Sequence, residues 1–184
     1  ETTALPLLPT RLFTAAQVLE LERLAIEDQG IPAIQLMKRA GRAAFNTLMA
    51  QYPELEPGIG KVSIYCGSGN NAGDGYVLAA LAAQRNIGVE IFQVGSPPAQ
   101  GALARAAFDY AGAAGVSFLP WTEELVPEYG VIVDALLGTG FKLGELRGKY
   151  AAAIQQINAA ELPVLALDLP SGLAADSGAT ADFA

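Results

Sequence analysis

Three segments of the chain combine glycines with amide, carboxylate or hydroxyl side chains, and each follows a short apolar run. The first is Gly67–Gly75, which reads Gly-Ser-Gly-Asn-Asn-Ala-Gly-Asp-Gly and lies between the apolar run Val62–Tyr65 and the helix-like run Tyr76–Arg85. Glycines permit positive φ and close approach of a ligand to the backbone. The first N–H groups of a following helix attract anions. We therefore predict that this segment is a phosphate-binding turn.

This segment matches neither of two common nucleotide-binding motifs. The dinucleotide fingerprint Gly-x-Gly-x-x-Gly needs a glycine where the chain has Ala72, and a P-loop needs Gly-Lys followed by Ser or Thr. Gly-x-Gly alone is explained as well by a tight turn. Asn70, Asn71 and Asp74 add donors and acceptors that an ordinary turn does not need, and they favour a binding site.

The other two segments are Asp134–Phe141 and Asp168–Leu173, and each begins with a carboxylate at the end of an apolar run. A carboxylate that closes a buried strand is costly unless it is paired or ligated. Each segment alone also fits a turn, because Asp, Ser, Pro and Gly favour turns. Together the three segments indicate one crevice, with glycines suited to phosphates and oxygen atoms suited to a hard cation.

Composition limits the functions that this chain can have. It has 184 residues, 52% of them hydrophobic, and a net charge of −8, which suits one domain and disfavours nucleic acid as a partner. We see no membrane-spanning run and no signal pattern, and we expect a cytoplasmic protein with no membrane partner. There is no histidine, so acid–base chemistry falls to Asp, Glu, Lys, Tyr or Cys66. Asp168 is the best-placed candidate.

The elements that would position these segments alternate along the chain. Two N-terminal helices are predicted within 14–50, and the first begins at Thr14, with Gln17 as capping-box partner, and ends near Gly30. The core, 61–173, alternates strands with helices, which indicates a mostly parallel α/β sheet with helices on both faces. Ligands of such sheets bind beyond the carboxyl ends of the strands. The predicted strands are 62–65, 89–94, 116–119, 131–134 and 164–167. The predicted helices between them are 74–86, 101–113 and 148–159, with about one turn in 122–128.

In the order and spacing of these segments, the chain resembles the NAD(P)H-hydrate epimerases, the YjeF N-terminal domain family. The matching pieces are Leu36–Gly41, Gly67–Gly75, Asp134–Gly140 and Asp168–Leu173. They span nearly the whole chain, which we treat as one domain, 1–184. The resemblance implies a Rossmann-like three-layer αβα sandwich that is usually a homodimer.

The resemblance also implies an activity. The family interconverts the R and S hydrates of NADH and NADPH (NADHX and NADPHX), which carry a hydroxyl at C6 of the nicotinamide ring. A dehydratase, separate or fused at the C-terminus, then regenerates the normal cofactor from the S form.

Individual residues take roles from the same resemblance. Asp168 would lie beside the nicotinamide ring and act as the acid–base residue. A potassium ion would be held by Asn71, Asp134 and Ser171. The residues that would contact the substrate are Asn70, Asn71, Ala72, Gly73, Asp74, Gly138, Thr139, Gly140, Phe141, Lys142, Leu143, Gly144 and Asp168.

The chain departs from the family pattern at several points. Ala72 replaces a common glycine, which is acceptable if residue 72 has negative φ, and Lys38 stands where an acidic residue is frequent. The family continues with further strands after the Pro-Ser-Gly loop, and we expect those strands to be missing here.

Two other functions stay open. One is a non-catalytic dinucleotide-binding or dimerisation module of the same fold, against which the retention of Asp168 and the three cation ligands counts. The other is a hydride-transferring oxidoreductase, against which the missing dinucleotide fingerprint counts.

Overall fold

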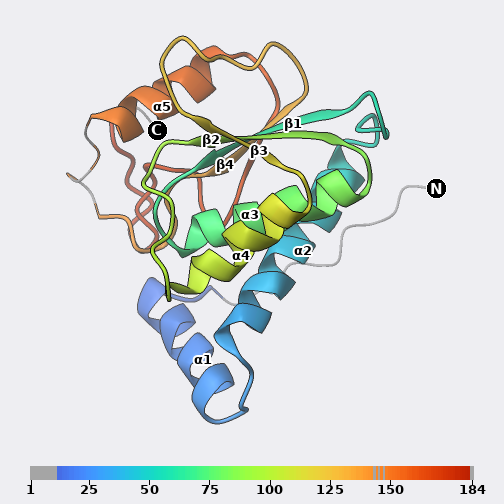
Figure 1. The fold of residues 1–184 in the computed structure, drawn as a ribbon. Coiled ribbons are helices and arrows are strands. Elements are labelled where there is room, and N and C mark those ends of the chain that lie inside the picture. The colour runs from blue at the N-terminus through green and yellow to red at the C-terminus, as the bar shows by residue number, and fades with distance from the viewer. Residues whose placement is uncertain (1–11, 143, 145, 147, 183–184) are drawn as a thin grey trace.

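The computed structural model of the protein describes residues 12–142, 144, 146 and 148–182, which form a five-stranded sheet with helices on both faces (Figure 1). Every strand pairing in it is parallel. The predicted α/β class is confirmed, and each predicted strand agrees with an observed one to within one residue at either end. The strands are β1 (Lys61–Cys66), β2 (Gly88–Gln93), β3 (Ser117–Pro120), β4 (Val131–Ala135) and β5 (Val164–Ala166).

In the sheet the strands lie in the order β3-β2-β1-β4-β5. The side of β1 on which the chain adds strands therefore reverses after β3. The chain fills one half of the sheet outward from β1 and then returns to begin the other half at β4. Such a reversal leaves a crevice beyond the carboxyl ends of the two central strands. Gly67–Gly75 follows β1 and Asp134–Phe141 begins in β4, so both segments lie at this point.

Two clusters of apolar side chains hold the three layers together. The larger lies between the sheet and helices α2 (Ala33–Gln51), α3 (Asn70–Gln84) and α4 (Leu103–Ala113), and the smaller lies between the sheet and α5 (Lys149–Ala159). Successive side chains of β1 enter opposite clusters, as alternation along a strand requires: Ile64 joins the first and Tyr65 the second. Figure 1 shows α3 and α4 on one side of the sheet and α5 on the other.

Helix α3 begins at Asn70, four residues before the predicted start at 74, so the prediction that residues 70–73 lie in a turn before the helix was wrong. Its glycines serve close packing instead. A Cβ on Gly73 would lie 2.5 Å from the Met37 side chain, and one on Gly75 would lie 2.9 Å from Ala135 Cβ. Ala72 is helical and has no positive φ, which satisfies the condition set by its departure from the family pattern.

The single helical turn predicted within 122–128 is also absent, and the segment contains only a turn at 123–124. Its carbonyl groups find another partner. The Gln156 side chain of α5 donates through Nε2 to the carbonyl oxygens of Thr122 and Glu123, at 3.2 and 2.9 Å. A side chain from a distant element thus replaces the hydrogen bonds that a helix would supply.

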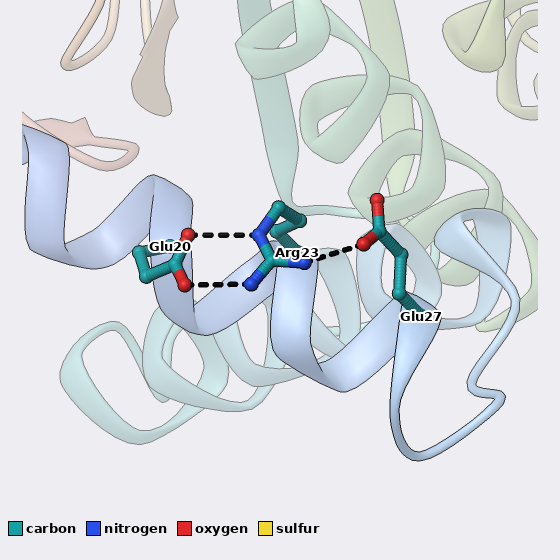
Figure 2. A network of polar contacts seen from close by, with 3 residues as sticks. All are labelled: Glu20, Arg23 and Glu27. Atoms are coloured by element: carbon teal, nitrogen blue, oxygen red, sulfur yellow. Dashed lines mark hydrogen bonds and ion pairs between the residues drawn. The ribbon is translucent and has the colours of Figure 1, made fainter.

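Helix α1 (Ala15–Glu27) begins with the predicted capping box, in which Thr14 and Gln17 exchange hydrogen bonds. None of its residues is buried, and Figure 1 shows it standing away from the sheet. Figure 2 shows Arg23 bridging Glu20 and Glu27 along its exposed side. Exposed ion pairs contribute little stability, so α1 is held mainly by its own backbone and by a few contacts at its ends. None of the described helices has both the length and the apolar character that crossing a membrane requires.

The crossing of α2 and α3 yields a test of the packing. In Gly41→Ala, the new Cβ would lie 2.5 Å from Val77 Cβ and 2.8 Å from the Asp74 carbonyl oxygen, and we expect the free energy of unfolding to fall by about 1–3 kcal/mol. In the matched variant Gly112→Ala, within α4, the nearest atom would be 3.9 Å away. Helix propensity should then raise the free energy of unfolding by about 0.5–1 kcal/mol. Urea denaturation measures both changes, and a shift of equal sign in the two variants would contradict the packing described here.

Candidate active site

A cavity of about 680 Å³ opens at the carboxyl ends of β1 and β4, and all three segments identified in the sequence contribute to its wall. The segments reach it from α3, from the loop after β4 and from the loop after β5. The predicted substrate contacts that line it are Asn70, Asn71, Asp74, Gly138, Thr139, Gly140, Phe141 and Asp168.

The other predicted contacts that the structure describes do not line this cavity. Ala72 and Gly73 are buried inside the packing of α3, while Lys142 and Gly144 are exposed outside the cavity. Leu143 lies outside the described residues. The helical start of α3 explains the first pair, because successive residues of a helix point in different directions.

The N-terminus of α3 opens directly onto the cavity. Its N-cap, Gly69, provides no side chain, and no side chain caps the first N–H groups. Those groups carry the positive end of the helix dipole and favour a phosphate or another anion. Cys66, at the end of β1, does not add a nucleophile, because complete burial raises the pKa of its thiol, with a further contribution from Asp134.

Beneath the cavity, the buried Asp134 carboxylate joins the loops after β4 and β5. Its Oδ1 accepts from the Ser171 hydroxyl at 2.7 Å and from the Leu136 N–H at 3.1 Å, and its Oδ2 accepts from the Ser171 N–H at 2.8 Å. Burial raises the pKa of Asp134, against the lowering effect of these hydrogen bonds. The carboxylate therefore fixes Ser171 relative to β4.

Asn71 extends this network to α3. Its Nδ2 donates to the carbonyl oxygens of Leu137 and Leu167, at 2.7 and 3.2 Å, and the Leu137 N–H donates to the Ser171 hydroxyl at 3.0 Å. Asn71 is therefore linked to Ser171 and Asp134 through the backbone of a single residue, Leu137. The Asn71 Oδ1 atom is buried and accepts no hydrogen bond from the described residues. An unpaired buried acceptor is costly, and a cation is one group that would satisfy it.

The predicted potassium ligands fit this arrangement. Amide, carboxylate and hydroxyl oxygens are the donors that a hard cation prefers. Among the described residues, no group of three or more His, Cys, Asp or Glu side chains is placed to hold a metal ion. A cation here would therefore depend on the neutral oxygens of Asn71 and Ser171 beside the Asp134 carboxylate.

Asp168 is an exposed residue whose carboxylate is fixed from one side. Its φ is +62°, which is uncommon for a residue other than glycine, and its Oδ2 accepts from the Thr139 N–H at 2.7 Å. A Cβ on Gly138 would lie 2.5 Å from the same oxygen. Glycine at position 138 thus lets the Asp168 carboxylate reach the loop after β4.

Asp74 differs from Asp168 in its surroundings. Asp74 is half-buried, and no hydrogen bond from the described residues reaches its carboxylate. Burial raises the pKa of Asp74 to about 7, and the negative charges of Asp168 and Glu22 add to the rise. The sequence pattern had placed Asp74 among the substrate contacts but contained no signal for this shift.

Several lining residues were missed by sequence reasoning. From α1 come Val18, Leu19 and Glu22, and from α5 comes Tyr150, whose hydroxyl lies 3.2 Å from Ser68 Oγ. Nothing in the local sequence marks them, because α1 and α5 carry no motif at these positions. The charged side chains among the described lining residues are those of Glu22, Asp74 and Asp168, so an anionic ligand would have to be held by backbone N–H groups.

Comparison with known proteins places this chain in a family. The profile of the "YjeF-related protein N-terminus" family matches residues 33–184. The bifunctional NAD(P)H-hydrate repair enzyme Nnr of Coxiella burnetii is 45% identical over 92% of this chain and 33% of its own length. The NAD(P)H-hydrate epimerase of Limosilactobacillus fermentum is 33% identical over 91% of this chain and 77% of its own length.

A solved structure shows the same fold. The yeast protein YNL200c superposes with a TM-score of 0.77 at 22% identity, over 89% of this chain and 72% of the yeast chain. The chain spans about a third of the length of the bifunctional relatives that it matches. From the family match and the identity to these relatives, it follows that the chain belongs to the YjeF-related N-terminal domain family.

Proposed function

We propose that the protein interconverts the R and S hydrates of NADH and NADPH, and so takes part in the repair of nicotinamide cofactors. One observation carries the proposal: a single cavity contains both an uncapped helix N-terminus, suited to phosphates, and two carboxylates, suited to proton transfer. The relatives named NAD(P)H-hydrate epimerase support it, since this chain covers most of their length.

The substrate would bind along the wall formed by Asn70, Asn71, Asp74 and the loop residues 138–141. Its phosphates would lie against the N-terminus of α3 and the glycine loop after β4, because the carboxylates of the cavity repel them elsewhere. Its hydrated ring would lie beside Asp168, the carboxylate that the Thr139 N–H holds in place at 2.7 Å. The ring carries no phosphate, so it can approach an acidic side chain.

Two of the carboxylates that line the cavity, those of Asp74 and Asp168, favour a catalytic role over a binding module. A module that only binds an anionic dinucleotide gains nothing from Asp74 and Asp168, which oppose its charge. Epimerisation at a carbon that bears a hydroxyl needs groups that give and accept protons. Hydride transfer would need a dinucleotide held by the Gly-x-Gly-x-x-Gly turn, and residue 72 is a helical alanine.

A potassium ion held by Asn71, Asp134 and Ser171 is part of the proposal. When bound, it would supply positive charge next to the acidic cavity and so favour an anionic ligand. The unpaired Asn71 Oδ1 supports this assignment. The three residues already connect α3 with the loops after β4 and β5, so they keep the cavity wall in place.

The wider setting of the reaction is also proposed. A dehydratase would consume the S form, supplied either by a separate protein or by a further part of the same chain, as the bifunctional relatives suggest. The protein would be a cytoplasmic homodimer. Apolar side chains exposed on α1 and just before it, Phe13, Leu19 and Leu21 among them, are candidates for contact between the protomers.

The activity is tested with purified R-NADPHX, by chromatographic separation of the R and S forms over time. We expect the wild-type protein to convert R to S well above the rate of the blank. Asp168→Asn keeps an acceptor for the Thr139 N–H and tolerates positive φ, so folding and NADP binding should persist while turnover falls about 10²-fold or more. The matched variant Asp182→Asn, an exposed carboxylate outside the cavity, should convert substrate normally. Near-normal turnover in Asp168→Asn would remove this residue from proton transfer.

The cation is tested through thermal stability. In potassium chloride the melting temperature should exceed that in tetramethylammonium chloride of equal ionic strength by about 2 °C or more, since a ligand that binds only the folded state stabilises it. Asn71→Ala should abolish this difference, because it removes the orphaned amide oxygen. The adjacent variant Asn70→Ala should retain it. Equal melting temperatures of the wild type in the two salts would argue against a potassium site.

A further inference from the structure

The carboxylates of Asp74 and Asp168 line the cavity from different elements, and they differ in their hydrogen bonding. Asp168 follows β5 and accepts a hydrogen bond from the Thr139 N–H. Asp74 lies in the second turn of α3, half-buried, with no donor among the described residues. The Asp168 carboxylate therefore has a backbone donor that holds it, whereas the Asp74 carboxylate has none among the described residues.

The surroundings of Asp74 strengthen this contrast. Burial raises its pKa to about 7, and Asp168 and Glu22 contribute further. Of the elements that wall the cavity, α1 brings Glu22, α2 brings only the apolar Ala40 and α5 brings Tyr150. No Lys or Arg side chain lies among the described lining residues. Near neutral pH, Asp74 therefore carries a proton for a substantial part of the time.

We propose that Asp74 is the acid of an acid–base pair in which Asp168 is the base, an inference that rests on the proposed epimerase function. Pairs of carboxyl groups whose environments separate their proton affinities commonly divide the two roles in this way. Sequence reasoning had assigned proton transfer to Asp168 alone.

The step that this pair would perform is the loss and return of water at C6. Protonated Asp74 gives its proton to the C6 hydroxyl, the C6–O bond breaks with its electron pair leaving on water, and the N1 lone pair forms a C6=N1 bond. Water then adds to the opposite face of C6, the C6=N1 electrons return to N1, and the Asp168 carboxylate takes the excess proton. Exchange with solvent returns the proton to Asp74, so substrate and product have the same composition.

The test uses the same chain with Asp74→Asn, the control Asp182→Asn, and R-NADPHX as substrate. We expect Asp74→Asn to lower turnover about 10²-fold or more while NADP affinity, measured by calorimetry, changes little. Retention of more than a tenth of wild-type turnover would overturn the assignment of Asp74. If neither the wild type nor Asp182→Asn converts R to S, the proposed function itself fails, and this inference falls with it.

The pH profile gives an independent measure that needs no variant. Because the acid must be protonated, wild-type turnover should fall as pH rises through about 7, the value to which the pKa of Asp74 is raised. A rate that stays constant from mildly acidic to mildly alkaline pH would overturn the proposal. In water enriched with ¹⁸O, the S product should carry the solvent oxygen at C6, and an unlabelled product would rule out this step.

The raised pKa of Asp74 should also make the stability of the folded protein depend on pH. The folded protein favours protonated Asp74, whereas the unfolded chain ionises it at the usual pKa of about 4. The favourable contribution is thus present at low pH and is lost as pH rises through about 7. Asp74→Asn should therefore raise the melting temperature at mildly alkaline pH and leave it nearly unchanged at about pH 4. An equal effect at both pH values would show that Asp74 is an ordinary exposed carboxylate.

Discussion

The arrangement of the site depends on the hydrogen bonds around the buried Asp134 carboxylate. This one side chain accepts from the Ser171 hydroxyl, the Ser171 N–H and the Leu136 N–H, and so connects the loop after β4 with the loop after β5. Asn71 joins the same network from α3 through Leu137. The start of α3 and two loops far apart in sequence are thereby held in one relative position. The neutral partners leave the negative charge uncompensated, which is the condition under which a bound cation is worth most.

A cavity with three carboxylates among its described lining residues is an unusual place for the anionic dinucleotide that we propose as its ligand. The conflict is resolved by position, because the uncapped N-terminus of α3 and the loop around Gly138 and Gly140 offer backbone N–H groups where phosphates can bind, while the carboxylates of Asp74 and Asp168 remain for the uncharged part of the ligand. The repulsion between those two carboxylates is then useful rather than harmful. It adds to the effect of burial in raising the pKa of Asp74.

Helix α1 contributes to the site without belonging to the core. None of its residues is buried, yet Val18, Leu19 and Glu22 form part of the cavity wall. A hydrogen bond of 2.8 Å from the Ala15 N–H to Asp176 ties its start to the segment after β5. A wall held by so few contacts has low local stability, which suits the entry and release of a ligand as large as a dinucleotide.

The local sequence determined the strands, the capping box at Thr14 and the three segments that line the cavity, because β-branched runs, helix caps and glycine–carboxylate clusters act through neighbouring residues. Their convergence also followed from the alternation of strands and helices, since a parallel sheet places all strand ends on one edge. Only the tertiary structure decided that α3 begins at Asn70, where glycines pack against Met37 and Ala135. It also decided the different states of Asp74 and Asp168 and the unpaired oxygen of Asn71. Those properties depend on burial and on charges that approach through space, such as Glu22 near Asp74, and neither is encoded in the spacing of residues along the chain.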